Sequence, residues 1–217
     1  MAQNPQPIIL LTGFAPFAGE AVNPSWQAAR ALDGEMLEGH RVIAMELPTE
    51  FEASLRALRR TLRATRPRVA IAVGLAGGRA GISLERVAIN VVDARIPDNA
   101  GARPVDVPVV RRGPVGYFST LPIKSALASL HGAGIDAHIS QTAGTYVCNA
   151  VFYALMHAVR RKRLRAGFVH VPYLPEQARR HDAPGMPLDQ VIDALRIIAR
   201  TSLTTRIDAR TSGGAES

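Results

Sequence analysis

The sequence has little cysteine and no long apolar run. Cys148 is the one cysteine in 217 residues, so the chain can form no internal disulfide and supply no thiolate metal cluster. No apolar run approaches the roughly 20 residues that cross a bilayer, and Met1–Pro7 has no basic segment typical of a signal peptide. One thiol and no export signal favour the reducing cytoplasm as the location.

The chain is also poor in lysine, although its formal net charge is +8. Lys124 and Lys162 are the lysines, so the excess positive charge is almost wholly arginine, scattered along the chain. The densest cluster, Arg160–Arg163 with Arg165, lies at the end of a predicted helix, where cations complement the helix dipole. No aromatic residues interleave with this cluster, as nucleic-acid recognition often requires. We therefore expect no nucleic-acid partner and no membrane partner.

Alternating strand and helix patterns run through the chain and predict an α/β fold around a largely parallel sheet. Predicted strands cover residues 8–13, 41–47, 69–73, 87–92, 135–140 and 167–171, and predicted helices cover 24–32, 49–64, 121–130, 148–159 and 188–203. Asn23-Pro24 supplies an N-cap and a first-turn proline, and Thr49–Glu52 is a predicted capping box. The Pro-, Gly- and Arg-rich stretch 94–120 is expected to be a long functional loop. The length suits one domain, 1–217, with a core of about 8–203 and a short polar tail.

Cys148 sits where a predicted loop becomes a helix. A helix N-terminus is positive and lowers the pKa of a thiol, which makes the thiolate nucleophile more available. A lone cysteine also serves as a small buried apolar side chain. Position alone leaves both interpretations open.

Cysteine catalysis needs a base and a third group that orients it. In open α/β sheets, sites form beyond the C-terminal ends of strands. Cys148 follows one predicted strand, His170 ends another, and Glu85 follows the loop 74–79. His170 is the one histidine framed by apolar residues, although a structural histidine fits there too, and Glu85 next to Arg86 also suits a plain ion pair.

The glycine-rich loop 74–79 resembles a phosphate loop only loosely. It lacks the Gly-Lys-Ser/Thr ending of a P-loop and leads into a strand instead of a helix. We interpret it as a tight turn that lets backbone approach a ligand, with no nucleotide implied.

Seven short motifs together resemble pyroglutamyl peptidase I, also called pyrrolidone-carboxylate peptidase. In chain order they are Leu11–Phe17, Asn23–Trp26, Ala76–Arg79, Glu85–Asn90, Ala94–Asn99, Gly144–Asn149 and His170–Gln177. Any one motif is weak evidence, but their ordered occurrence over about residues 8–203 is highly specific.

The resemblance implies a cytosolic cysteine peptidase that removes an N-terminal pyroglutamyl residue from peptides. The family's Cys, His and Glu triad maps onto Cys148, His170 and Glu85. The implied fold is a three-layer α/β/α sandwich with a twisted, largely parallel central sheet, commonly assembled as a homotetramer. The implied chemistry uses neither a metal nor a cofactor.

The resemblance also implies a small apolar slot for the pyroglutamyl ring. The positions assigned to that slot are Phe14, Phe17, Tyr146, Val147 and Leu75. Ordinary core packing is the alternative for the two phenylalanines. Arg95 is implied as an oxyanion ligand, with a salt bridge to Asp93 or Asp98 as the alternative.

Three positions depart from the family pattern, and two other functions compete. Ala15 stands where an acidic residue is frequent, Leu75 replaces a common Gln, and Tyr146 stands where Phe is frequent. A basic nucleic-acid-binding protein would bind with a steep salt dependence that survives loss of Cys148. A phosphorylase-like transferase on a related fold would depend on phosphate and ignore thiol alkylation, and the Cys, His and Glu set speaks against both.

Overall fold

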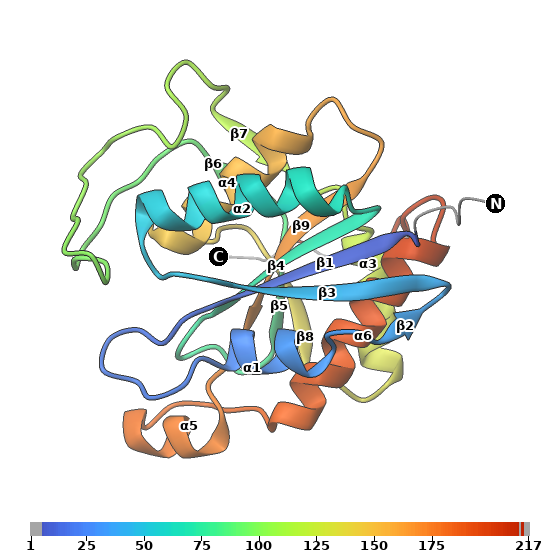
Figure 1. Cartoon of the computed structure of the whole chain (residues 1–217). Coiled ribbons are helices and arrows are strands. Elements are labelled where there is room, and N and C mark those ends of the chain that lie inside the picture. The colour runs from blue at the N-terminus through green and yellow to red at the C-terminus, as the bar shows by residue number, and fades with distance from the viewer. Residues whose placement is uncertain (1–5, 213, 215–217) are drawn as a thin grey trace.

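A seven-stranded sheet forms the centre of the computed structural model, which describes residues 6–212 and Gly214 (Figure 1). The strand order is β2-β3-β1-β4-β9-β5-β8. These strands are β1 (Ile8–Phe14), β2 (Met36–Leu37), β3 (His40–Leu47), β4 (Val69–Leu75), β5 (Ile82–Glu85), β8 (Ala137–Ser140) and β9 (Arg165–Val171). The helices are α1 (Pro24–Ala31), α2 (Phe51–Thr65), α3 (Ile123–Gly132), α4 (Val147–Val159), α5 (Pro175–His181) and α6 (Leu188–Thr204).

The sheet is mixed but mostly parallel, which confirms the predicted α/β class. β3, β1, β4 and β9 run parallel to one another. β5 pairs antiparallel with β9 and parallel with β8, so β5 and β8 run against these four strands. β2 adds a short antiparallel edge to β3.

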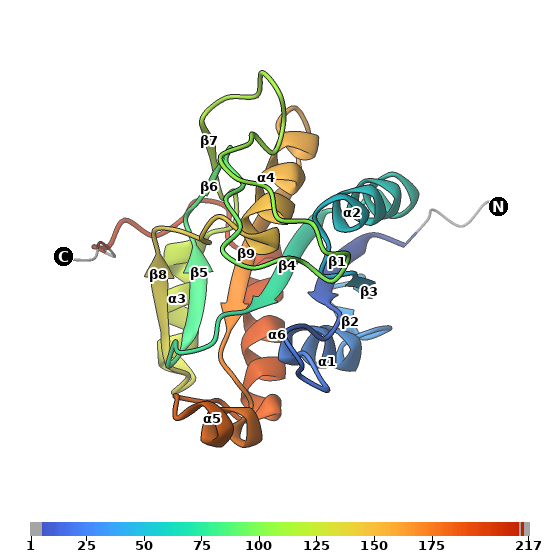
Figure 2. The same ribbon diagram turned by 90° about the vertical axis from the view of Figure 1, so that its left-hand side faces the viewer.

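Helices cover both faces of the sheet, as expected for a three-layer sandwich. α2 and α4 lie on one face and α1, α3 and α6 on the other (Figures 1 and 2). Alternate strand residues serve the two cores, as the two-residue side-chain period of a strand requires. Along β9, Phe168 joins the α2/α4 core whereas Val169 joins the α1/α3/α6 core.

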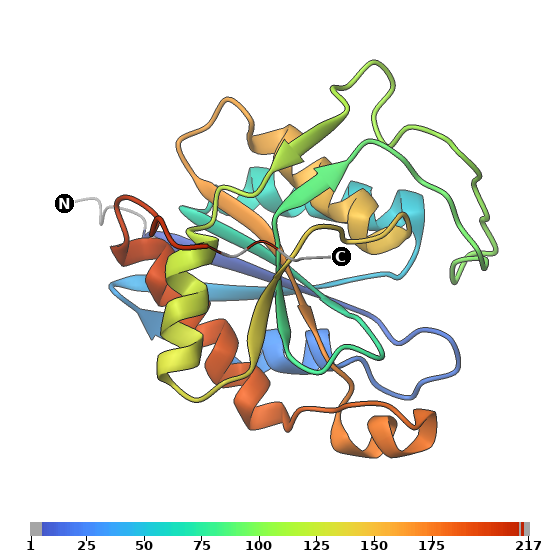
Figure 3. The same ribbon diagram turned by 180° about the vertical axis from the view of Figure 1, so that it is seen from behind.

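The expected long loop contains part of a second, two-stranded sheet. β6 (Val87–Ile89) pairs antiparallel with β7 (Gly116–Phe118), and the segment between them reaches out from the body (Figure 3). The predicted strand 87–92 was therefore too long and is no part of the central sheet. β2, β5 and α5 were not predicted, because they are short or, in α5, polar in sequence.

The helix-start signals gave one correct and one wrong prediction. Asn23 caps α1, its Oδ1 accepting from the Ser25 N–H at 3.1 Å, with Pro24 in the first turn. The predicted capping box at Thr49 does not form, because the Thr49 hydroxyl donates to the Ala15 carbonyl instead. The first N–H of α2, on Phe51, donates to Asp98 Oδ2 at 2.8 Å. A residue far along the chain therefore supplies this cap, which local sequence could not indicate.

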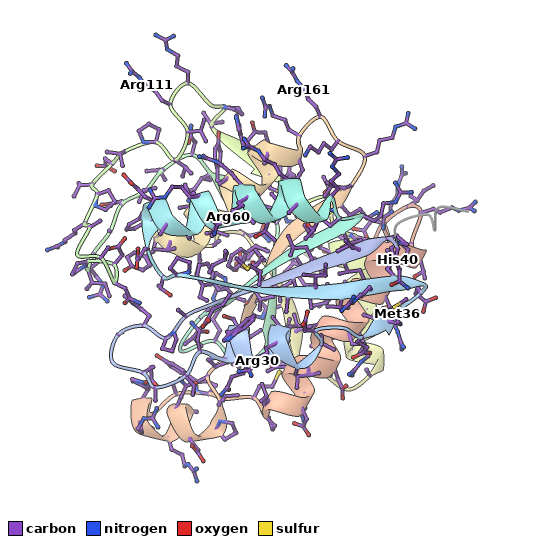
Figure 4. The ribbon with its side chains drawn as sticks, in the orientation of Figure 1. Arg30, Met36, His40, Arg60, Arg111 and Arg161 are labelled. Atoms are coloured by element: carbon purple, nitrogen blue, oxygen red, sulfur yellow. The ribbon has the colours of Figure 1, made fainter. Side chains whose placement is uncertain are left out.

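Arginine side chains reach outward on several sides of the molecule, as the labelled Arg30, Arg60, Arg111 and Arg161 show (Figure 4). Within the part of the chain that the structure describes, no helix has the length and apolar character needed to cross a membrane. Most of the polar tail, residues 213 and 215–217, lies outside the described residues.

Candidate active site

A buried His–Glu pair lies on the face of the sheet that α4 covers. His170 is near the end of β9 and Glu85 ends β5, and the antiparallel register places Ser83 opposite His170 and Glu85 opposite Phe168. The His170 Nδ1–H donates to Glu85 Oε1 at 2.7 Å. A carboxylate only accepts, so the Nδ1 proton is fixed and Nε2 is left as the basic nitrogen. His170 is 4% exposed and Glu85 0%, so both side chains lie inside the protein.

Cys148 is the second residue of α4, so the predicted position at a helix N-terminus is confirmed. Gly74 of β4 pairs with His170 in register. A Cβ atom built on Gly74 would lie 2.9 Å from Cys148 Sγ. The thiol thus lies against the strand neighbour of His170, although no hydrogen bond joins the two side chains within residues 6–212.

The three groups do not all meet at the C-terminal edge of the sheet, as the sequence argument assumed. β5 and β8 run opposite to β9, so the ends of the three strands do not coincide. Glu85 reaches His170 along the sheet face, and the chain after β8 returns to start α4 above it. The structure does bring His170 and Glu85 into contact, but not for the reason that the sequence argument gave, because the strands do not end at the same edge.

The pKa shifts indicate that Cys148 and His170 are both neutral at rest, whereas Glu85 is ionised. Burial lowers the pKa of His170, against the hydrogen bond and charge of Glu85, which raise it. Burial and then the Glu85 charge raise the pKa of the Cys148 thiol to about 12. Burial opposes ionisation of Glu85, but the hydrogen bond and charge of His170 hold its pKa below the usual value. The expectation that the helix terminus would make a ready thiolate is wrong, because burial outweighs the terminus.

We expect alkylation of Cys148 to become faster as pH rises above neutrality. A thiol whose pKa is raised is almost wholly protonated at pH 7, and only the thiolate reacts. The measurement is the rate of inactivation by iodoacetamide between pH 6 and 10, followed by mass of the modified protein. A rate that is already at a plateau at pH 6 would show a preformed thiolate–imidazolium pair and contradict the prediction.

A cavity of about 240 Å³ opens above the thiol. All the residues predicted for the slot line it together with Cys148, namely Phe14, Phe17, Leu75, Tyr146 and Val147. Tyr146 is held between aromatic rings, with centroids 5.4 Å from Phe17 and 5.1 Å from Phe51. Such contacts fix ring positions as well as burying area, so this end of the cavity is a rigid apolar slot.

The two cavity departures from the family pattern have different consequences. The Tyr146 hydroxyl donates to the Pro97 carbonyl at 2.9 Å, which ties the slot to the segment before the projecting loop. Leu75 offers the cavity no hydrogen bond where Gln would. The side chain of Ala15 has no polar role, but its N–H donates to Leu47 and its carbonyl accepts from Asn23 and Thr49.

Arg95 is exposed and is not among the residues that line the cavity. Within residues 6–212, Arg95 forms no salt bridge, so the pairing with Asp93 or Asp98 is not seen. Asp98 is buried and accepts from the N–H groups of Phe51, Ala100 and Ala102 instead.

Sequence reasoning missed a polar cluster on the other side of the cavity. Glu20 accepts from His181 Nε2 at 2.6 Å, from Arg180 at 2.6 Å and from Gln177 at 2.8 Å. The His181 ring stacks on Tyr173 with centroids 4.7 Å apart. These bonds join the loop after β1 to α5. The sequence showed His181 only as part of a polar Arg/Asp stretch, because its partner Glu20 lies far away in sequence.

We expect Gly74→Ala to lower the free energy of unfolding by about 1–3 kcal/mol and to reduce kcat. The added Cβ would lie 2.8 Å from Phe168 Cζ and 2.9 Å from Cys148 Sγ, so the nucleophile must shift. Thermal unfolding and steady-state kinetics measure the two effects. Gly132→Ala is the matched control, because a Cβ there meets nothing within 4 Å. Equal behaviour of the two variants would contradict the prediction.

Comparison with known proteins gives a consistent match. The sequence model of the pyroglutamyl peptidase family matches residues 8–205. The chain is 58% identical over 207 residues to the pyrrolidone-carboxylate peptidase of Chromobacterium violaceum, covering 95% of this chain and 97% of that protein. It is 52% identical over 212 residues to that of Cupriavidus taiwanensis, covering 96% and 98%.

Solved structures agree with the sequence matches. The crystal structure of pyroglutamyl peptidase I from Bacillus amyloliquefaciens superposes with a TM-score of 0.93 at 44% identity, covering 95% of this chain and 100% of that one. A mutant pyrrolidone carboxyl peptidase (E192I) from Pyrococcus furiosus gives a TM-score of 0.88 at 41% identity, covering 90% and 98%. These values confirm the α/β/α sandwich.

Proposed function

The chain belongs to the pyroglutamyl peptidase family and is a peptidase acting on pyroglutamyl substrates, and we propose that it works through a thiol acyl-enzyme on Cys148. His170 is the general base and acid, and Glu85 orients it. The single observation that supports this assignment is the geometry around Gly74. His170 of the buried His170–Glu85 pair is the register partner of Gly74, the Cys148 thiol lies against Gly74, and Cys148 lines the cavity together with the predicted slot residues.

The reaction begins from a neutral thiol and a neutral imidazole. His170 Nε2 takes the Cys148 proton as sulfur attacks the carbonyl carbon that joins pyroglutamate to the next residue. The tetrahedral intermediate collapses, the C–N bond breaks, and the imidazolium gives its proton to the leaving amine. Water, deprotonated by His170, then attacks the thioester and releases pyroglutamic acid and the free thiol. Glu85 stabilises the imidazolium at both stages through its bond to Nδ1.

The oxyanion is stabilised by the Cys148 backbone N–H at the start of α4, where the helix dipole also favours negative charge. By family resemblance Arg95 is the second donor. Arg95 is exposed and is not among the residues that line the cavity, so its side chain has to turn toward the thiol to take this role. The Tyr146 hydroxyl binds the carbonyl of Pro97, two residues further along the chain.

The slot suits a lactam and excludes a charged amino terminus. Pyroglutamate is a five-membered ring without an α-ammonium group, so it enters an apolar cavity at a lower desolvation cost than a charged amino terminus does. Phe14, Phe17, Tyr146 and Val147 are the ring-binding residues in this proposal. Leu75 adds apolar area but no hydrogen bond, so the lactam polar groups rely on backbone partners.

The remaining proposals concern assembly and location. Val105, Val107, Val115 and Phe118, on the segment around β7, are exposed apolar side chains that suit burial against another copy, in support of a homotetramer. A nucleophilic thiol that must stay reduced suits the cytoplasm. The substrate is then a cytoplasmic peptide with an N-terminal pyroglutamyl residue, without a metal, cofactor or nucleic acid.

The test is release of a fluorophore from a pyroglutamyl amide, with a prolyl amide as control and reductant present. We expect selective cleavage of the pyroglutamyl amide, because the proline ring carries a charged nitrogen and lacks the lactam carbonyl. Equal cleavage of both substrates, or cleavage that survives full alkylation of Cys148, would show that the slot or the nucleophile is wrongly assigned.

A further inference from the structure

The guanidinium of Arg79 contacts the candidate triad directly. Its Nη1 donates to Glu85 Oε1 at 2.7 Å, the same oxygen that accepts from His170 Nδ1. Nη1 also reaches Ser140 Oγ at 3.3 Å, and Nη2 donates to the Thr142 carbonyl at 3.2 Å. The side chain of Arg79 is 29% exposed, whereas that of Glu85 is fully buried.

The contacts of Arg79 join Glu85, which orients the proposed base His170, to the segment that leads to Cys148. Arg79 follows β4, Glu85 ends β5, and Ser140 with Thr142 begins the segment that runs from β8 into α4. That segment ends at Cys148 in the first turn of α4. A guanidinium presents several N–H donors in one plane, so it can bind all three acceptors at once in a way that lysine cannot.

The glycine loop explains how Arg79 reaches this place. A Cβ on Gly77 would lie 2.4 Å from the Tyr173 ring, and Gly78 has a φ of +86° that other residues rarely adopt. The turn that the sequence suggested for ligand contact therefore delivers a side chain to Glu85.

Building on the proposed triad, we propose that Arg79 is a positioning residue for the reaction, whose guanidinium holds Glu85 and the segment leading to Cys148 in one arrangement. It also balances the Glu85 charge, which His170 and Cys148 both face. Without this cation the carboxylate would hold the imidazole proton too firmly and oppose formation of the thiolate.

The charges around His170 set the sign of the expected pH effect. Burial lowers the pKa of His170, Glu85 on β5 raises it, and Arg79 in the loop after β4 lowers it. The neutral Cys148 thiol lies against Gly74, the register partner of His170. His138 of β8 lies 3.0 Å from the hydroxyl of Ser83, which pairs with His170 across the two strands. Removing the Arg79 charge therefore raises the pKa of His170, and the acid limb of kcat/KM moves to higher pH.

The experiment compares pH profiles of Arg79→Gln, Arg79→Lys and wild type on a pyroglutamyl amide. We expect Arg79→Gln to move the acid limb up by about one pH unit and to lower kcat roughly tenfold or more. Arg79→Lys should keep the limb at its wild-type pH, because the charge stays, but lose roughly tenfold in kcat since fewer acceptors are reached. A wild-type kcat with an unmoved limb in folded Arg79→Gln overturns the proposal.

Arg196→Gln is the matched control, because Arg196 is similarly exposed, at 28%, and binds Glu35 away from the cavity. It should lose stability without moving the pH profile. If Arg79→Gln does not fold, folded Arg79→Lys decides alone, and wild-type kcat in that variant overturns the proposal. A wrong assignment of the triad gives a different result: Cys148→Ala would then keep its activity, independently of the Arg79 variants.

Discussion

Cys148→Ala is expected to lower kcat on a pyroglutamyl amide by about five orders of magnitude, as loss of a nucleophile does in other triads. Alanine removes the atom that forms the acyl-enzyme and leaves the slot intact, so substrate should still bind. His170→Ala should lose a similar factor, because the resting thiol is protonated and the variant lacks the proposed general base. Steady-state kinetics with active-site titration of the wild type measure both.

The double variant Cys148→Ala/His170→Ala tests whether the two residues act together in one step or contribute independently. If Cys148 and His170 act in one step, Cys148→Ala/His170→Ala should be no slower than either single variant. Losses that multiply would mean that the two residues act separately. Thermal unfolding is the folding control, because both side chains pack beside the buried ring of Phe168.

Most of the fold was predictable because its long elements carry strong local signals. Strand β4 and helix α6 show clear apolar patterns, and Asn23-Pro24 marks the start of α1. What failed depended on distant contacts: β5 gains its identity from pairing with β9 and β8, and α2 takes its cap from Asp98. The pairing of β5 and the remote cap of α2 have no local signature in the sequence.

The candidate site residues could be named from the sequence as a set, but their spatial relations could not. A resemblance in motif order named Cys148, His170 and Glu85, yet the reversed direction of β5 is visible only in three dimensions. The helix terminus suggested an acidic thiol, whereas burial beside Glu85 makes it a weak acid. Arg79 was read as part of a turn, because the side chain that it serves lies across the loop and in the next strand.

These relations change how the mechanism should be understood. In the proposed mechanism the thiol and the imidazole are neutral at rest, and the proton moves to His170 as sulfur attacks the substrate carbonyl. The Glu85 carboxylate favours this transfer because it stabilises the imidazolium, but its charge also opposes the thiolate. Glu85 thus favours protonation of His170 but disfavours ionisation of Cys148, so a variant without its carboxylate measures which effect is larger.

We expect Glu85→Gln to lower kcat by about two to four orders of magnitude while KM changes little. Glutamine is nearly isosteric, but its amide cannot stabilise an imidazolium as a carboxylate does. If its NH₂ group faces His170, it donates to Nδ1 and forces the proton onto Nε2, where the base is needed. The variant also leaves Arg79 without its anionic partner, so some loss of stability accompanies the loss of rate.

Glu85→Asp is the matched variant, because it keeps the charge but shortens the reach to Nδ1. It should recover part of the lost kcat if charge dominates, and recover none if the 2.7 Å contact to His170 dominates. Kinetics between pH 5 and 9 distinguish the role of charge from that of the contact. Loss of the carboxylate in Glu85→Gln lowers the pKa of His170 and moves the acid limb of the profile to lower pH, whereas Glu85→Asp keeps the charge. This shift is opposite to that expected for Arg79→Gln, so the two variants test one electrostatic arrangement from both sides. A Glu85→Gln enzyme with wild-type kcat would show that His170 is oriented by its packing alone.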